Sequence, residues 1–177
     1  SAVGYGALYT NTANYNTALG AYALYLTSTG ANNTAVGRNA LRVNTTGTRN
    51  TAVGFAALDA NTTSTDSTAI GWNALGVNTG AENTAVGSRS LDANTTGTRN
   101  TAMGDLSATE NETGTDITAI GWNALRYSTA SSNTAVGSRS QDATTTGGSN
   151  TSIGDMSLSA NTTGDDNTAL GKGALRD

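Results

Sequence analysis

The chain has 177 residues, of which only 12% are charged and 5% aromatic, and its net charge of −4 argues against nucleic acid or an anionic membrane surface as a partner. Thr, Ala, Gly and Asn make up more than half of the residues, so the chain lacks the large apolar side chains of a thick globular core. Cys, His and Pro are absent, which excludes a disulfide framework and removes both the commonest general base and the commonest metal ligand.

A short motif, Asn-Thr-Ala-(Val/Ile/Leu)-Gly, recurs along the whole chain and defines the organisation. Its final residues, here called the marker glycines, are Gly4, Gly20, Gly37, Gly54, Gly71, Gly87, Gly104, Gly121, Gly137, Gly154 and Gly171. Successive marker glycines stand sixteen or seventeen positions apart. A longer period of 50 residues is superimposed, since Trp72 recurs as Trp122 and Gly104-Asp105 as Gly154-Asp155. We therefore expect residues 1–177 to form a single array with a super-repeat of three coils.

The first expected element of each unit is a strand that ends at the marker glycine. Residues alternate with a period of two, which is typical of a strand. Three positions before the marker glycine stands a threonine in ten copies, Thr17, Thr34, Thr51, Thr68, Thr84, Thr101, Thr118, Thr134, Thr151 and Thr168. One position before it stands an aliphatic residue or Met in every copy. Thr and the aliphatic residue share one face, and Asn, Ala and Gly share the other.

The Thr and aliphatic columns have two interpretations. Because every member of the aliphatic column is apolar, the column is expected to be buried, either in the core of the coil or against a three-fold axis between chains. In the other interpretation the two columns form a flat, uncharged face that binds a ligand. The eleven windows around this motif contain no charged residue, so the strip is expected to face something other than bulk water.

A second strand is expected after the marker glycine. Leu stands four residues after it in nine copies, for example Leu24 and Leu41, and an apolar residue such as Val43 follows two positions later. An exposed type of residue lies between them, as Arg42 does. The Asn-Thr-Thr-Gly segment then makes the turn, with glycines available for positive φ.

These elements predict an all-β fold, a parallel β-solenoid or β-roll of about eleven coils of about 16–17 residues with two short strands in each coil. At about 4.8 Å per coil the rod would be roughly 50 Å long. The core of each coil is thin, so we expect further stabilisation from hydrogen-bond ladders, from stacked Asn and Thr columns or from association with other chains. Neither end carries a distinct capping repeat, which indicates a segment of a longer fibre.

The segment Ser-Thr-Ala-Ile-Gly-Trp-Asn-Ala at 67–74 resembles the head repeats of trimeric autotransporter adhesins. The runs of Asn-Thr-Ala-Val-Gly, Ala-Leu and Asn-Thr-Thr-Gly are also similar to repeats of bacteriophage tail-fibre proteins. The resemblance covers the whole chain, although the coil here is longer than the common adhesin repeat. It implies a left-handed parallel β-roll, three chains packed about one axis, and an extracellular location on a cell surface or virion. It also implies binding of a host-surface glycan or protein receptor.

The sequence offers no catalytic constellation, so we expect no enzymatic activity, no cofactor and no metal site. The thirteen Asp and Glu residues are scattered, which is typical of charges that promote solubility. No apolar run approaches the roughly 20 residues of a membrane-spanning helix, so membrane insertion is not expected. Phe55, Trp72 and Trp122, with Tyr5, follow a marker glycine directly, at a position that elsewhere carries charged residues such as Arg38. These aromatic residues either stack on the sugar rings of a receptor or cover a groove or a seam between chains.

Three functions follow from this pattern. The first is a homotrimeric fibre segment, adhesin-like or tail-fibre-like, that serves as a stalk or a receptor-binding head. The second is an ice-binding solenoid, because a regular Thr ladder on a β-solenoid resembles the arrangement used by ice-binding proteins. The third is a purely structural extracellular filament.

Overall fold

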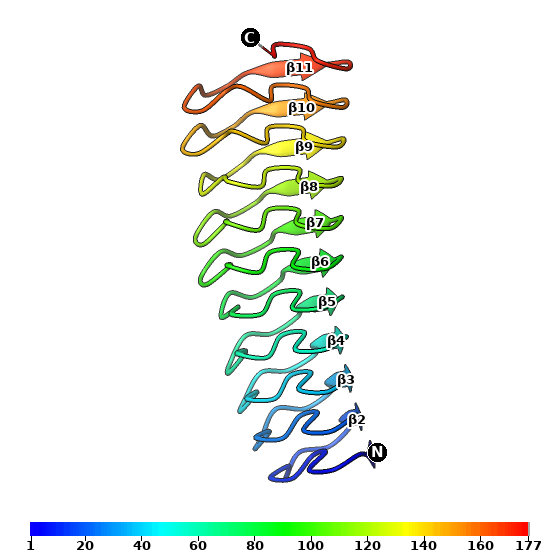
Figure 1. Ribbon diagram of the computed structural model, residues 1–177. Helices are drawn as coiled ribbons and strands as arrows, with labels where there is room; N and C mark the ends of the chain where they lie inside the picture. The colour runs from blue at the N-terminus through cyan, green and yellow to red at the C-terminus, as the bar shows by residue number, and fades with distance from the viewer. Residues whose placement is uncertain (177) are drawn as a thin grey trace.

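The structure is a computed structural model that describes residues 1–176. Eleven parallel strands lie in one sheet in chain order, so the chain is an all-β parallel solenoid, as predicted (Figure 1). The strands are β1 (Ala2–Val3), β2 (Thr17–Leu19), β3 (Thr34–Val36), β4 (Thr51–Val53), β5 (Thr68–Ile70), β6 (Thr84–Val86), β7 (Thr101–Met103), β8 (Thr118–Ile120), β9 (Thr134–Val136), β10 (Thr151–Ile153) and β11 (Thr168–Leu170). Within residues 1–176 there is no helix long and apolar enough to cross a membrane.

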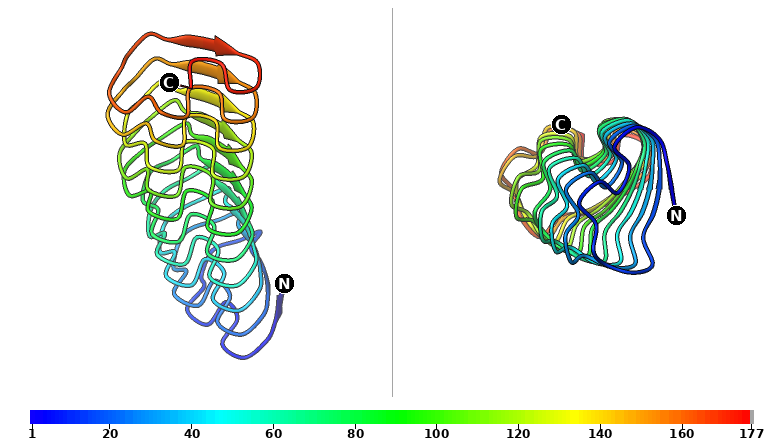
Figure 2. Two further views of the ribbon diagram at one scale, coloured as in Figure 1. Left: turned by 45° about the horizontal axis from the view of Figure 1, so that its top comes forward. Right: turned by 90° about the horizontal axis from the view of Figure 1, so that it is seen from below.

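Each strand pairs in register with its equivalents in the neighbouring coils. Thr34 pairs with Thr51 and Val36 with Val53, and the same register is repeated from β2 to β11. Identical positions of the repeat therefore stack into continuous columns. Viewed along the stack, successive coils overlap with a gradual rotation, as expected from the twist of a sheet (Figure 2).

The core of the coil is built from small residues and one leucine. The alanine at the centre of each strand is buried, as at Ala35 and Ala52, and the predicted leucine column is buried beside it, as at Leu41 and Leu58. A second column, three residues after the marker glycine, supplies further buried Ala or Ser side chains, such as Ala40. The strand thus contributes only small side chains to the core, and the leucines supply most of its large ones.

The second strand predicted in each coil does not form. The leucine segment is a series of turns, because the residues two and four positions after the marker glycine have positive φ, as at Asn39 (61°) and Leu41 (49°). A strand requires negative φ. The coils nevertheless stay hydrogen-bonded through this segment, since Leu41 N donates to Ala57 O at 3.0 Å and Asn39 N donates to Ala21 O at 3.0 Å.

The marker glycines are required by the stacking of the coils. Gly104 has a φ of +136°, and a Cβ added to it would lie 2.5 Å from the carbonyl oxygen of Gly121 in the next coil. The glycine therefore serves both as the left-handed residue that ends the strand and as the point of closest approach between coils.

Asparagine columns satisfy the buried backbone at the other end of the strand. The Asn four residues before the marker glycine points inward, and Asn83 and Asn100 are both buried. Asn83 Oδ1 accepts the backbone N–H of Asn100 at 3.0 Å, and its Nδ2 donates to Gly97 O at 2.8 Å. Each such Asn thus bridges its own coil to two backbone groups of the next coil.

Candidate functional site

The outward side chains of the strands form one surface along the whole stack, here called the Thr-aliphatic face. In each strand from β2 to β11 the central Ala or Ser is buried, while the Thr and the aliphatic residue on either side of it point outward. The two columns are about 6.6 Å apart across the strand and repeat about every 4.8 Å along the stack. The sequence prediction that Thr and the aliphatic residue share a face is confirmed.

The aliphatic column does not contribute to the core of the coil. Its exposed fractions include 49% at Leu19, 41% at Ile70, 43% at Met103 and 44% at Ile153. The expectation that these residues are buried within the coil is therefore wrong for the single chain. The physical reason is the narrow space behind the strand, because its inner side accommodates only Ala or Ser. Within the strands the larger apolar residues therefore lie on the outer side, and the large apolar side chains of the core are mainly the leucines of the segment after the marker glycine.

The threonines of this face have hydroxyl groups that are unused within the protein. None of the ten strand threonines has a side-chain hydrogen bond within residues 1–176. The threonines at the corners differ, since Thr45 Oγ1 donates to Thr62 O at 3.0 Å and Thr145 Oγ1 donates to Thr162 O at 3.0 Å. The Thr-aliphatic face therefore offers a regular row of hydroxyls beside a continuous apolar stripe.

Charged side chains lie on the other sides of the stack, where they pair between coils. Arg49 Nε lies 2.6 Å from Asp66 Oδ1, and the equivalent Arg99 Nε, three coils further along, lies 2.7 Å from Asp116 Oδ1. The hydrogen bonds from Arg49 and Arg99 hold the pKa of Asp66 and of Asp116 below the ordinary value of an aspartate. These pairs are bidentate but exposed, so they link neighbouring coils without being part of the core.

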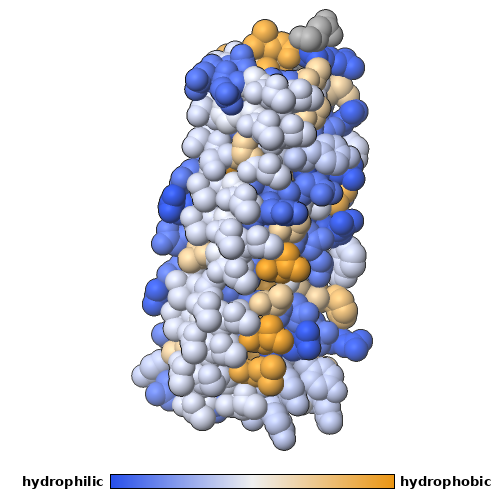
Figure 3. Space-filling model, turned by 90° about the vertical axis from the view of Figure 1, so that its left-hand side faces the viewer, coloured by the Kyte–Doolittle hydropathy of each residue, from blue (hydrophilic) through white to orange (hydrophobic). Residues whose placement is uncertain are grey.

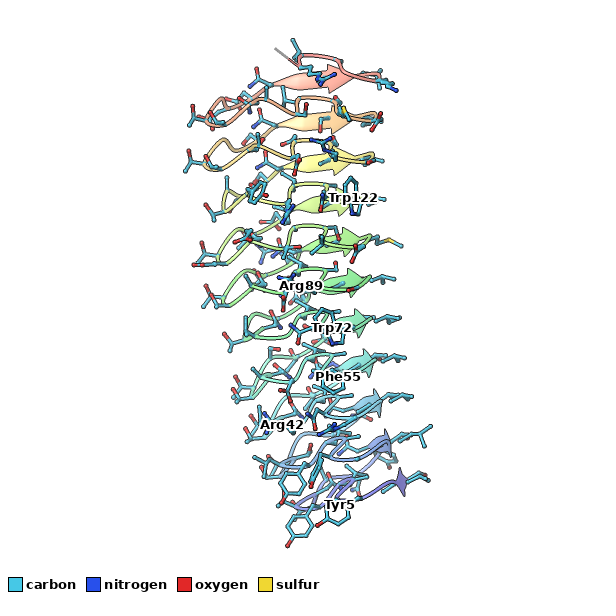
Figure 4. All side chains as sticks on the ribbon, in the orientation of Figure 1. Tyr5, Arg42, Phe55, Trp72, Arg89 and Trp122 are labelled. Atoms are coloured by element: carbon cyan, nitrogen blue, oxygen red, sulfur yellow. The ribbon has the colours of Figure 1, made fainter. Side chains whose placement is uncertain are left out.

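The predicted aromatic positions are exposed and lie in one file up the stack (Figure 4). The exposed fraction is 45% at Phe55, 52% at Trp72 and 49% at Trp122. Phe55 and Trp72 belong to adjacent coils, and the guanidinium of Arg38 lies 5.9 Å from the centre of the Phe55 ring. Trp122 lies on the third coil after that of Trp72, so the file does not bring the three aromatic rings together into one site.

A cluster of four tyrosines near the N-terminal end was not identified from the sequence, apart from Tyr5. Tyr5 and Tyr9 lie in the first coil and Tyr22 and Tyr25 in the second, and their rings contact one another. The signal was the recurrence of Tyr five residues after two successive marker glycines, at 9 and 25. Since equivalent positions of adjacent coils stack, that recurrence predicts a pair of stacked rings.

No group of three or more acidic residues is placed to hold a metal ion in the part of the chain that the structure describes. The side of the molecule that carries the loops leading into the strands has a broad strip of near-neutral hydropathy between hydrophilic edges, with apolar side chains over the N-terminal coils and again at the C-terminal end (Figure 3). Comparison with known proteins finds no matching protein family, no matching characterised protein and no matching solved structure.

Proposed function

We propose that the chain is a segment of a non-enzymatic extracellular fibre on a cell surface or virion, in which three copies associate through their Thr-aliphatic faces. The observation that carries this proposal is the aliphatic column, which is apolar in all eleven coils and lies on the outside of the single chain. A continuous exposed apolar stripe of this kind marks an interaction surface. Association of three chains would bury it and would supply the stabilisation that the thin coil core lacks.

The composition of the column favours packing against protein. The aliphatic position is occupied by Val, Leu, Ile or Met in different coils. Side chains of different length can interdigitate with those of another chain, as they do in a protein core. They are less suited to matching the surface of an ice crystal, because such a match requires side chains that project equally far from every strand. In this arrangement the remaining sides of the rod, with the aromatic file, stay available for a receptor.

The row of unused hydroxyls favours a second candidate function, the binding of ice. The strand threonines are in register from coil to coil, and their hydroxyls have no partner within residues 1–176. A flat ladder of this regularity would order water on its surface. This function requires that the Thr-aliphatic face remain exposed, whereas the fibre requires that it be covered.

The mass of the purified chain in solution separates the two functions. Native mass spectrometry or light scattering should give three times the chain mass of 17.7 kDa. A clean monomer would contradict the trimeric fibre. The monomer would then be tested by partitioning into a growing ice front, and its exclusion from the ice would contradict the second function as well.

A further inference from the structure

Four tyrosines on the first two coils, Tyr5, Tyr9, Tyr22 and Tyr25, line a hollow of about 330 Å³. It lies near the N-terminal end of the rod, where Tyr5 is labelled in Figure 4. Tyr5 meets Tyr22 edge-on, with ring centres 5.4 Å apart and an interplanar angle of 83°. Tyr22 meets Tyr25 in the same way, at 5.4 Å and 83°. Tyr9 stacks on Tyr25 at 5.2 Å and 16°. Tyr22 is therefore one wall of the hollow, roughly perpendicular to the others.

The rings are held in place but are not covered. Tyr5 is 76% exposed and Tyr9 is 71% exposed, while Tyr22 and Tyr25 are half-buried. None of the four phenol hydroxyls takes part in a hydrogen bond within the described residues. The hollow thus presents apolar ring surfaces together with free hydroxyl groups that can donate or accept.

Gly6 keeps this hollow open. It stands two residues after the marker glycine, where most other coils have a longer side chain, and it has a φ of +66°. A Cβ at Gly6 would lie 3.2 Å from the rings of Tyr22 and Tyr25. In the sixth coil the equivalent residue is Arg89, whose side chain pairs with Asp92 of the same coil at 3.1 Å.

An adjoining hollow of about 280 Å³ shares Tyr22 and Tyr25 and is lined by Arg38, Asn39 and Arg42. Arg42 is engaged by Asp59 at 2.7 Å, but Arg38 is exposed and has no ion-pair partner among residues 1–176. Charge is also distributed unevenly along the rod. Residues 1–58 contain three Arg and no Asp or Glu, whereas all thirteen acidic residues lie from Asp59 onward. The tyrosine hollow therefore lies in a stretch of positive formal charge, although the chain as a whole is acidic.

From these features we infer that the two adjoining hollows bind an acidic saccharide. The C–H face of a sugar ring packs on the tyrosine rings, and sugar hydroxyls exchange hydrogen bonds with the phenol groups. The carboxylate of the sugar is received by the unpaired guanidinium of Arg38, which forms charge-assisted hydrogen bonds to such a group. The inference deepens the proposed receptor-binding role and rests on it, since it assigns a chemical class of receptor and a place on the rod.

Other ligands of aromatic hollows fit these surroundings less well. A quaternary ammonium group is attracted to ring faces, but here it would lie beside Arg38 and Arg42 with no acidic residue on the first three coils. A single-stranded nucleic acid also stacks on aromatic rings but needs a groove lined with many cations, and the rest of this rod is acidic.

The test uses the whole chain on an array of immobilised oligosaccharides that end in sialic acid or glucuronic acid, each beside its neutral counterpart. The expected result is binding to acidic members, at least tenfold weaker in Tyr9→Ala and in Tyr22→Ala. In Arg38→Gln, binding to acidic members should fall about tenfold, to the level of the neutral ones. Tyr127→Ala is the matched control, because Tyr127 is an exposed tyrosine 4.9 Å from the Arg126 guanidinium without a cluster around it, and it should bind as the unmodified chain does.

Three outcomes would overturn the inference. The first is no binding to any acidic oligosaccharide. The second is binding by Tyr9→Ala and Tyr22→Ala that is as strong as that of the unmodified chain. The third is a preference for choline or oligo-dT over every saccharide in competition. The outcome is separable from the test of the fibre, because both coils of the site belong to one chain. A monomer that binds acidic saccharides would contradict only the proposed trimer. A trimer that binds no acidic saccharide would contradict only the proposed saccharide site.

Discussion

Asn33 Oδ1 accepts the backbone N–H of Asn50, its equivalent one coil further along the stack, at 2.9 Å. The Nδ2 of the same side chain donates to Gly47 O at 2.8 Å. Asn33 and Asn50 are both fully buried, so water cannot replace these bonds. Asn combines an acceptor and a donor on a short side chain, so a single residue can bond both a backbone N–H and a backbone carbonyl of the next coil.

Replacing Asn33 by Ala should therefore destabilise the solenoid by about 1–3 kcal/mol, because it leaves the N–H of Asn50 buried without a partner, while the carbonyl of Gly47 keeps only its hydrogen bond from Asn44 Nδ2. The measurement is the midpoint of urea unfolding followed by circular dichroism. Asn14→Ala is the control, since Asn14 is exposed and its side chain makes no hydrogen bond in the described part of the chain. Equal effects of the two substitutions would mean that the asparagine column does not stabilise the stack.

A marker glycine should be among the least replaceable residues. Gly104→Ala is expected to cost more than about 2 kcal/mol, since the new Cβ would meet Gly121 O and the backbone would be held at a φ of +136°. Gly171 separates the two causes, because its φ is +113° but no atom lies within 4 Å of an added Cβ. Gly171→Ala should cost clearly less, and an equal loss in thermal unfolding would show that close approach between coils contributes nothing.

The stacking of coils was predictable from the spacing of the marker glycines, since a nearly constant period with a fixed strand motif leaves few alternatives. The conformation of the leucine segment was not predictable from the sequence. Its alternation of apolar and polar residues is the pattern of a strand, but Leu41 and its equivalents adopt positive φ. Leu has no intrinsic preference for that conformation, so the turn is imposed by the stacking of the coils and leaves no signal in the residue type.

The sequence also did not predict that the Thr-aliphatic face points outward. A period of two separates two faces of a strand but does not say which of them is inside. Hydrophobicity alone favours Val36 over Ala35 for the core, and the structure has the reverse. Size decides the matter, because the inner side of the strand packs against the buried leucines and accommodates only Ala or Ser. The exposed positions of Phe55, Trp72 and Trp122 were predictable, since charged residues occupy the same column in other coils.

The ion pairs between coils give the protein a response to acid that can be followed at single residues. Folding lowers the pKa of Asp66 through its hydrogen bonds with Arg49. A carboxyl whose pKa is lowered by folding contributes stability above the pKa of the unfolded chain, about 4, and this contribution is lost as the pH falls through the lower pKa of the folded state. The contribution of Asp66 should therefore be present at neutral pH and be lost progressively as the pH falls below about 4.

Removing the arginine should raise that pKa. In Arg49→Gln we expect the pKa of Asp66 to return toward the ordinary aspartate value, measured from the carboxyl ¹³C shift in an NMR titration. Asp116 is an internal control in the same sample, because it is held in the same way by Arg99, three coils further along the stack. An unchanged Asp66, or an Asp116 that moves as far, would contradict the assignment of the shift to this pair.

The Thr-aliphatic face can be tested by placing charge on it. Ile70 and Met103 are 41% and 43% exposed, so Ile70→Glu with Met103→Glu should leave the coil core and the far-ultraviolet circular dichroism unchanged. In a trimer built on this face the new carboxylates would be buried without partners, which is strongly destabilising, and the mass should fall from three chains to one. Val77→Glu is the matched control, because Val77 is 45% exposed but lies on the flank beside Arg89 and Asp92, and it should keep the trimer. A double variant that stays trimeric would place the interface elsewhere on the rod, because no association through the Thr-aliphatic face could accommodate two unpaired charges in each chain.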